Sequence, residues 1–155
     1  MLELKSCNSC LMLETRPRIT FSDSGKCSAC EWVDIKRTLN WEKRERELIE
    51  TLQEYRGVNK PFDCLVPVSG GKDGSYVAYN LKHKYGMNPL TVTIKPHMPS
   101  ALGEQNLINF TRSGFDHLAV SPDYEIMSKL NKRGFIELGF PYYGWLLAIT
   151  NAPLF

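Results

Sequence analysis

The sequence predicts an α/β protein in which a small metal-binding element precedes a parallel-sheet domain. Three observations support this class. Four of the five cysteines crowd the first thirty residues. Further along, an apolar run, a glycine-rich loop, a helical pattern and a second apolar run follow in the order of a βαβ unit. The 155 residues and the hydrophobic fraction of 43% suffice for one ordinary domain plus an appendage. We expect a zinc-ribbon-like knuckle over 1–33, a connecting helix over 34–60 and part of an α/β domain over 61–155.

The cysteines have the spacing of a four-thiolate zinc site. Cys7 and Cys10 form one Cys-x2-Cys turn, and Cys27 and Cys30 form a second turn after sixteen intervening residues. The segment 15–21 between them has strand character, which predicts a hairpin. All four ligands would come from the protein, so we expect a structural zinc ion, without which so small an element would not fold. The alternative is a set of free, buried cysteines.

The elements that follow can be assigned from apolar periodicity and from turn residues. Residues 34–56 are predicted to form one helix with a single apolar side. A strand over 63–68, a helix over 75–85 and a strand over 90–94 predict two parallel strands joined by a right-handed crossover.

The C-terminal third of the sequence continues the alternation. We expect a helix over 103–113, a strand over 117–120 and a helix over 123–138 with Asp123 as its N-cap. The tail from Tyr142 onward predicts one more helix and then the first residues of a strand over 153–155. Because that strand would begin at the last residues, we expect the sequence to be part of a longer polypeptide.

The loop Ser69-Gly-Gly-Lys-Asp-Gly-Ser75 joins the first predicted strand to the following helix. Adjacent glycines allow the backbone to approach a ligand, and the first amides of the helix point toward it, so the loop suits an anion. The segment 95–97 falls at the same ligand-binding edge of the predicted sheet. The loop has neither the Walker spacing nor the G-x-G-x-x-G pattern.

The loop resembles the Ser-Gly-Gly-x-Asp-Ser-Ser/Thr loop of the PP-loop ATP pyrophosphatases, whose domain is HUP-like (adenine nucleotide alpha hydrolase-like). Cysteine knuckles ahead of Val-Ser-Gly-Gly-Lys-Asp-Gly-Ser-Tyr-Val-Ala-Tyr, followed by Leu-Lys-His-Lys-Tyr-Gly-Met, Pro-Leu-Thr-Val-Thr, Pro-His and Ser-Gly-Phe-Asp-His, narrow the resemblance. These motifs are similar to those of the N-acetyl sugar amidotransferases of lipopolysaccharide O-antigen and flagellin-glycan biosynthesis. One residue departs from the pattern, since Gly74 stands where the family usually has a serine.

The resemblance implies an ATP-dependent amidotransferase. ATP, with Mg²⁺, would activate the acetamido oxygen of an N-acetylated sugar or nucleotide sugar and release pyrophosphate. Ammonia from a separate glutaminase partner would then displace AMP and leave an acetamidino group. The resemblance assigns nucleotide binding to Ser69, Gly70, Gly71, Asp73, Gly74, Ser75 and His97, and catalytic roles to Lys72, Asp73 and Ser75.

Purely structural explanations stay open for several of these residues. Lys72 occupies a variable position and is equally well explained as a solvated lysine. His97 matches the family's Pro-His, yet it could be a structural loop histidine. Glu104 and Asn106 could contact the substrate at a helix N-terminus, although capping and solvation explain them as well. Asp73 is the only loop candidate for a Mg²⁺ ligand.

Charge and hydropathy limit the partners. The net charge of +2 comes from 19 basic and 17 acidic residues, so we do not expect nucleic acid as the main partner. No apolar run approaches the roughly 20 residues of a membrane span, and the N-terminus lacks a secretory signal. We therefore expect a cytoplasmic protein without membrane contact.

Two other functions are compatible with the same residues. A PP-loop tRNA sulfur transferase also carries cysteine knuckles, but it would need reactive or iron-sulfur cysteines after the loop and a basic surface. A non-catalytic zinc-ribbon and nucleotide-binding fragment is the second alternative. Whatever the function, a homodimer or a partner subunit could cover the unpaired edge of the predicted sheet.

Overall fold

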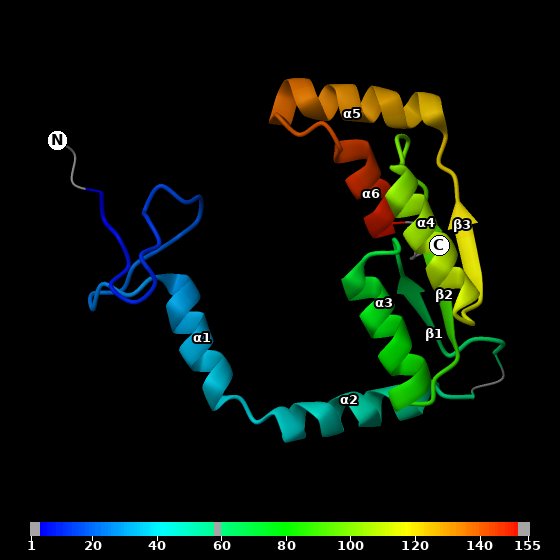
Figure 1. Cartoon of the computed structure of the whole chain (residues 1–155), viewed down its shortest axis with the longest axis horizontal. Helices are drawn as coiled ribbons and strands as arrows, with labels where there is room; N and C mark the ends of the chain where they lie inside the picture. Colours follow the sequence, from blue (N-terminus) through cyan, green and yellow to red (C-terminus); the bar gives the residue numbers. More distant parts are fainter. Residues whose placement is uncertain (1–3, 58–59, 152–155) are drawn as a thin grey trace. The chain divides into compact units, whose positions relative to one another are not determined.

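The chain forms two compact units, Met1–Glu47 and Leu48–Phe155. The structure, a computed structural model, describes residues 4–57 and 60–151. Its architecture is α/β, as the sequence predicts, with a small parallel sheet in the second unit (Figure 1).

The first unit begins with a cysteine-rich hairpin that contains two isolated antiparallel bridges, Ser6 with Leu13 and Phe21 with Cys27. The prediction of a strand over 15–21 is wrong. The backbone turns twice there, with hydrogen bonds from the Arg16 amide to the Leu13 carbonyl and from the Ile19 amide to the Arg16 carbonyl. Pro17 has no amide hydrogen to donate to a strand ladder, which favours a turn over a strand.

The predicted continuous helix over 34–56 is also wrong, because the structure has two helices. Helix α1 spans Ser28–Thr38 and helix α2 spans Trp41–Tyr55. Leu39 is extended, and the Asn40 side chain accepts a 2.9 Å hydrogen bond from the Lys43 amide. Asparagine is a strong N-cap, so the local preference of Asn40 ends one helix and starts the next.

The second unit contains a parallel sheet in the order β1-β2-β3. Its strands are β1 (Cys64–Pro67), β2 (Pro89–Ile94) and β3 (His117–Val120), which confirms the three predicted strands within two residues at each end. Because the spatial order follows the chain order, two right-handed crossovers place both connecting helices on the same face of the sheet. Figure 1 shows α3 and α4 together on that face.

The crossover helices frame the glycine loop. Helix α3 spans Lys72–Tyr79 and continues as a π-helical turn, η1, over Asn80–Lys84. It begins three residues earlier than predicted, so the second half of the predicted loop is the first turn of the helix. Helix α4 spans Ala101–Arg112, and the Ser100 side chain caps it by accepting a hydrogen bond from the Gly103 amide.

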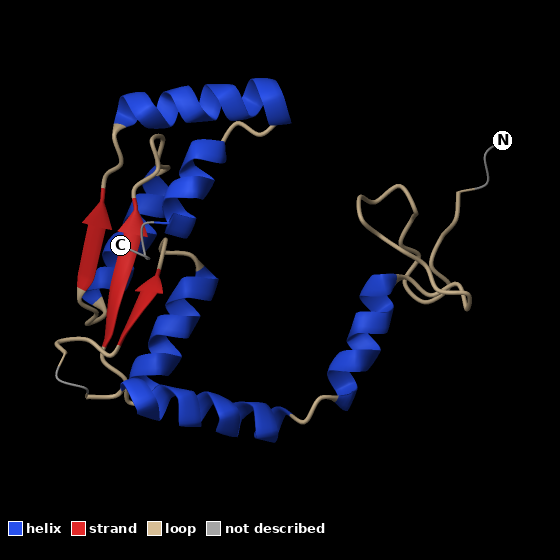
Figure 2. Cartoon of the chain, turned by 180° about the vertical axis from the view of Figure 1, so that it is seen from behind, coloured by secondary structure: helices blue, strands red, loops and turns tan. Residues whose placement is uncertain are grey.

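The core of the second unit lies between the sheet and these two helices. Val66 and Val68 pack there with Ala78 and with a stacked pair of rings, Phe110 and Phe115, whose centroids lie 4.8 Å apart. The alternation of side chains along a strand sends Leu65, Leu118 and Val120 to the opposite face, where they are exposed. Figure 2 shows the strands from this opposite side, in front of α3 and α4.

Helices α5 (Tyr124–Leu138) and α6 (Tyr143–Asn151) complete the described part of the second unit. The predicted N-cap is confirmed, because Asp123 accepts a 2.8 Å hydrogen bond from the Ile126 amide. The predicted strand over 153–155 lies outside the described residues. Helices α5 and α6 pack through glycines, and a Cβ added to Gly134 would lie 2.3 Å from the Tyr143 Cβ. This close packing brings α6 to the carboxyl end of the sheet.

We expect Gly134→Ala to lower the free energy of unfolding by about 1–3 kcal/mol, because the added methyl overlaps α6. At an exposed helix position the same change would raise the free energy of unfolding by about 1 kcal/mol, so the sign of the measured change distinguishes a packed position from an exposed one. Urea unfolding followed by circular dichroism measures it. Lys132→Ala, at an exposed position of the same helix, is the control. If Gly134→Ala is as stable as the parent, the two helices do not pack this closely.

Candidate functional site

The four N-terminal cysteines form one cluster, as their spacing predicts. All four sulfur atoms lie within 4.8 Å of one another. The Cys10 and Cys27 sulfurs are 3.6 Å apart, and the Cys7 and Cys30 sulfurs are 4.0 Å apart. In a tetrahedral site with zinc–sulfur bonds of about 2.3 Å, sulfur atoms are about 3.8 Å apart. The cluster is therefore positioned to bind a metal ion and is compatible with structural zinc.

Local backbone geometry explains how the hairpin brings the two cysteine turns together. Asn8 connects the two turns. Its side-chain nitrogen Nδ2 donates a 2.7 Å hydrogen bond to the Ser24 carbonyl, and its backbone amide donates to the Gly25 carbonyl. Gly25 has φ +77°, a left-handed conformation that glycine adopts without strain. The turn that carries Cys27 is thereby placed against the turn that carries Cys7.

The surroundings of the sulfurs shift the pKa values of Cys7 and Cys30 in opposite directions. Burial raises the pKa of Cys7, but amide hydrogen bonds, those from Ser9 and Cys27 foremost, outweigh it and lower that pKa to about 6. The hydrogen bond with the Cys10 sulfur, together with burial, raises the pKa of Cys30 to about 12. Four sulfurs packed together resist full ionisation unless a cation lies among them.

The glycine loop runs from the end of β1 to the start of α3. Gly70 has φ +77°, and a Cβ at this position would lie 2.7 Å from the Leu107 amide nitrogen of α4. The loop backbone therefore lies directly against the backbone of a neighbouring helix. Only glycine satisfies both the conformation and the contact.

Gly74 is also packed closely, but against the end of β1. It lies in the first turn of α3, and an added Cβ would lie 2.8 Å from the Pro67 carbonyl oxygen and 3.1 Å from the Val68 Cα. The departure from the PP-loop pattern thus has a structural cause in this chain. The helix approaches the end of β1 so closely that a serine would require the backbone to move.

The remaining loop residues differ in what they do. The side chains of Lys72 and Asp73 form an ion pair and are 90% and 88% exposed. The Ser75 hydroxyl donates a 2.8 Å hydrogen bond to the Gly71 carbonyl, so it lies along the helix. No side chain of the described residues caps α3, whose N-cap is Gly71. The first amides of this helix are therefore available to a ligand.

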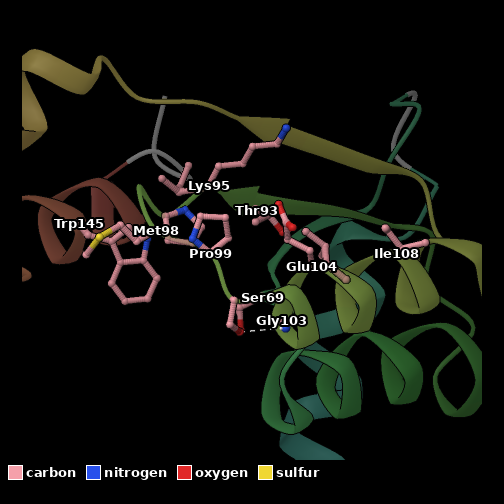
Figure 3. Close-up of a pocket in the computed structure, with 13 residues that line it drawn as sticks. Ser69, Thr93, Lys95, Met98, Pro99, Gly103, Glu104, Ile108 and Trp145 are labelled. Atoms are coloured by element: carbon pink, nitrogen blue, oxygen red, sulfur yellow. Dashed lines mark hydrogen bonds between the residues drawn. The ribbon is translucent and has the colours of Figure 1, made fainter.

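A cavity of about 510 Å³ adjoins the loop at the carboxyl end of β2. Ser69 of the loop, Thr93 of β2 and Glu104 of α4 contribute polar groups to its lining. Figure 3 shows Met98 and Trp145 on one side of this cavity and Glu104 and Ile108 on the other. Glu104 is thus at the site. Asn106, the other weak candidate, is not in the lining, although its backbone lies close to Gly70.

A second cavity, of about 600 Å³, lies next to the first and contains His97. The His97 ring packs against the Tyr124 ring with centroids 4.7 Å apart. Pro96, Met98 and Trp145 line both cavities and form the wall between them. The structure therefore brings His97 to a neighbouring cavity, not to the one that Ser69 lines.

Sequence reasoning missed the aromatic residues of this region. Trp145 and Tyr142 come from the C-terminal helix and the turn before it, and Tyr124 begins α5. The signal that could have identified Tyr142 and Trp145 is the aromatic-rich run Tyr142-Tyr-Gly-Trp145, which leads into a short helix with glycine at its packing face.

Comparisons with known proteins add a distant relative. No protein-family model matches the chain. The chain is 27% identical over 131 residues to an uncharacterized protein of Methanocaldococcus jannaschii, in an alignment that covers 83% of this chain and 47% of that protein. It therefore spans about half the length of the curated relative it matches.

Among the described residues, no helix is long and apolar enough to cross a membrane.

We expect Gly74→Ser to destabilise the second unit by about 1–3 kcal/mol, even though it supplies the hydroxyl that the PP-loop pattern contains. The reason is the contact of the new side chain with the Pro67 carbonyl. Thermal unfolding measures the effect. Tyr76→Ser, at a 72% exposed position of the same helix, is the control and should lose less. A Gly74→Ser variant as stable as the control would contradict the close approach of α3 to β1.

We expect the protein to bind about one zinc ion per chain through the four cysteines. Elemental analysis of Cys27→Ser should show loss of the metal, because a closed site tolerates no missing ligand. Chelation should make the hairpin sensitive to protease, because a small metal-held element unfolds without its ion. Cys64→Ser, outside the cluster, should keep the metal. Four freely titratable thiols in the metal-replete protein would contradict a metal site.

Proposed function

We propose that the protein is an ATP-dependent N-acetyl sugar amidotransferase of the PP-loop type, with a HUP-like nucleotide-binding domain. The motifs that resemble this family suggest the reaction, and the structural observation that supports nucleotide binding is the uncapped first turn of α3 behind the Ser69-Gly70-Gly71 loop, next to a cavity at the carboxyl end of β2. Open α/β sheets bind their ligands at this edge.

The loop has the properties of a phosphate cradle. The amides at the start of α3 carry the positive end of the helix dipole. Gly70 and Gly71 place no side chain between these amides and a ligand. The Lys72 side chain is 90% exposed, and its ion pair with Asp73 lies at the surface. It can therefore turn toward a phosphate group at little cost.

The adjoining cavity suits the nucleoside part of ATP. Its volume of about 510 Å³ lies within the range of about 300–1,000 Å³ for small-molecule sites. Its walls are mainly apolar and include Leu107 and Ile108 of α4 and Trp145 of α6, and the polar groups are few. A base can lie against the apolar wall while the triphosphate extends to the loop.

The proposed reaction breaks the bond between the α and β phosphates. The acetamido oxygen attacks the α phosphorus of ATP, and pyrophosphate leaves with the electrons of the broken bond. Ammonia then attacks the activated carbon, loses a proton to solvent, and AMP departs with the former amide oxygen. The product is an amidine. The loop amides stabilise the charge that develops on the pyrophosphate.

Two further components accompany this proposal. Mg²⁺ would be held by the phosphates of ATP and by the exposed Asp73 carboxylate, and it would neutralise phosphate charge. Ammonia would come from a glutaminase partner. The four-cysteine hairpin would hold structural zinc, which would take no part in the reaction. ATP is a cytoplasmic metabolite, and we place the reaction in that compartment.

We expect incubation of the protein with [α-³²P]ATP, ammonium and N-acetylglucosamine to yield labelled AMP only when the sugar is present. Asp73→Asn should lower the rate by at least about 100-fold if the carboxylate supports phosphate and metal binding. Glu137→Gln, an exposed acid on α5, is the control. Two results would refute the proposed chemistry. One is labelled ADP in place of AMP, and the other is AMP formation at a rate that does not depend on any N-acetylated sugar supplied.

A further inference from the structure

The second cavity differs from the first in charge. Among the described residues, those that line it include no Asp, Glu, Lys or Arg. The first cavity, in contrast, is lined by Lys95, Glu104 and the loop residue Ser69. A cavity without cations does not compensate the charge of a phosphate, so an uncharged ligand suits the second cavity better than a nucleotide does.

The lining combines flat rings with hydrogen-bonding groups. Tyr124, Tyr142 and Trp145 contribute aromatic rings, and Ser128 contributes a hydroxyl. The Asn131 carbonyl oxygen accepts a 2.8 Å hydrogen bond from the Gly144 amide, which fixes this side chain and leaves its NH₂ group as a donor for a ligand. Flat apolar faces with a few fixed polar groups match the alternating apolar and hydroxyl surfaces of a pyranose ring.

Two buried polar atoms in this region lack a protein partner. Among the described residues, the His97 Nε2 and the Trp145 Nε1 are buried and make no hydrogen bond. Both residues line the second cavity. A buried polar atom without a partner costs about 1–3 kcal/mol, which a ligand hydroxyl or carbonyl would recover once rotation of the ring brings the atom to the cavity surface.

We propose that this second cavity is the acceptor site and binds the ring of an N-acetylated hexosamine, with Tyr124 as a stacking platform. The inference rests on the proposed function, because it names the place where the acceptor of that reaction binds. The two cavities meet at the wall formed by Pro96, Met98 and Trp145. The reaction requires the acetamido oxygen to reach past these three residues to the α phosphate of a nucleotide in the first cavity, so we place the acetamido group on the side of the second cavity that adjoins the first.

The test uses N-acetylglucosamine and ATP as separate probes, and both dissociation constants are measured by calorimetry. Tyr124→Ala should weaken sugar binding about tenfold, or about 1.4 kcal/mol, with ATP binding unchanged. Tyr124→Phe keeps the ring and should retain sugar binding. Tyr76→Ala is the matched control, because Tyr76 is 72% exposed, close to the 70% of Tyr124, and lines neither cavity.

Several results would overturn the assignment. One is equal sugar affinity in Tyr124→Ala and Tyr76→Ala, and another is no saturable sugar binding by the parent protein. Competition between ATP and the sugar would show that the nucleotide occupies the second cavity. Sugar-dependent AMP formation with an unchanged KM for the sugar in Tyr124→Ala would leave the proposed function standing and refute this acceptor site. Ring-dependent sugar binding without AMP formation would support the site and refute the chemistry.

Discussion

The close approach of backbone to backbone at Gly70 and Gly74 is the constraint on which the candidate site depends. Gly70 lies against the α4 backbone, and Gly74 lies against the end of β1. These contacts fix the loop between two helices and a strand, so the first amides of α3 point in one direction without a capping side chain. A loop held in this way needs little reorganisation to receive a phosphate group.

Sequence reasoning succeeded where a signal is local. The strands were predictable because short apolar runs are bounded by turn residues, and the Asp123 cap was predictable because an acid precedes a periodic run. The cysteine cluster was predictable from ligand spacing. The break at Asn40 was missed because the charge pattern continues on both sides of it, and only the Asn40 side chain marks a new helix.

Two other features depend on distant contacts. From the sequence alone, Gly74 is a position that lacks the expected serine hydroxyl. In the structure, Gly74 lies so close to Pro67 that there is no room for a side chain. His97 was expected beside the loop because it follows β2, yet it lies against Tyr124, 27 residues further along the chain. Neither relation can be read from residue types, because the packing of α3 and α5 determines both.

The wall between the two cavities links helix packing to the proposed chemistry. Trp145 belongs to α6, and α6 reaches the sheet because Gly134 and Gly144 allow it to lie against α5. A larger residue at either glycine would displace the wall along with the helix. The separation of a charged cavity from an uncharged one therefore depends on two positions that touch neither ligand. Such positions influence a reaction through geometry alone, because a displacement of about 1 Å between reacting groups can cost about 100-fold in rate.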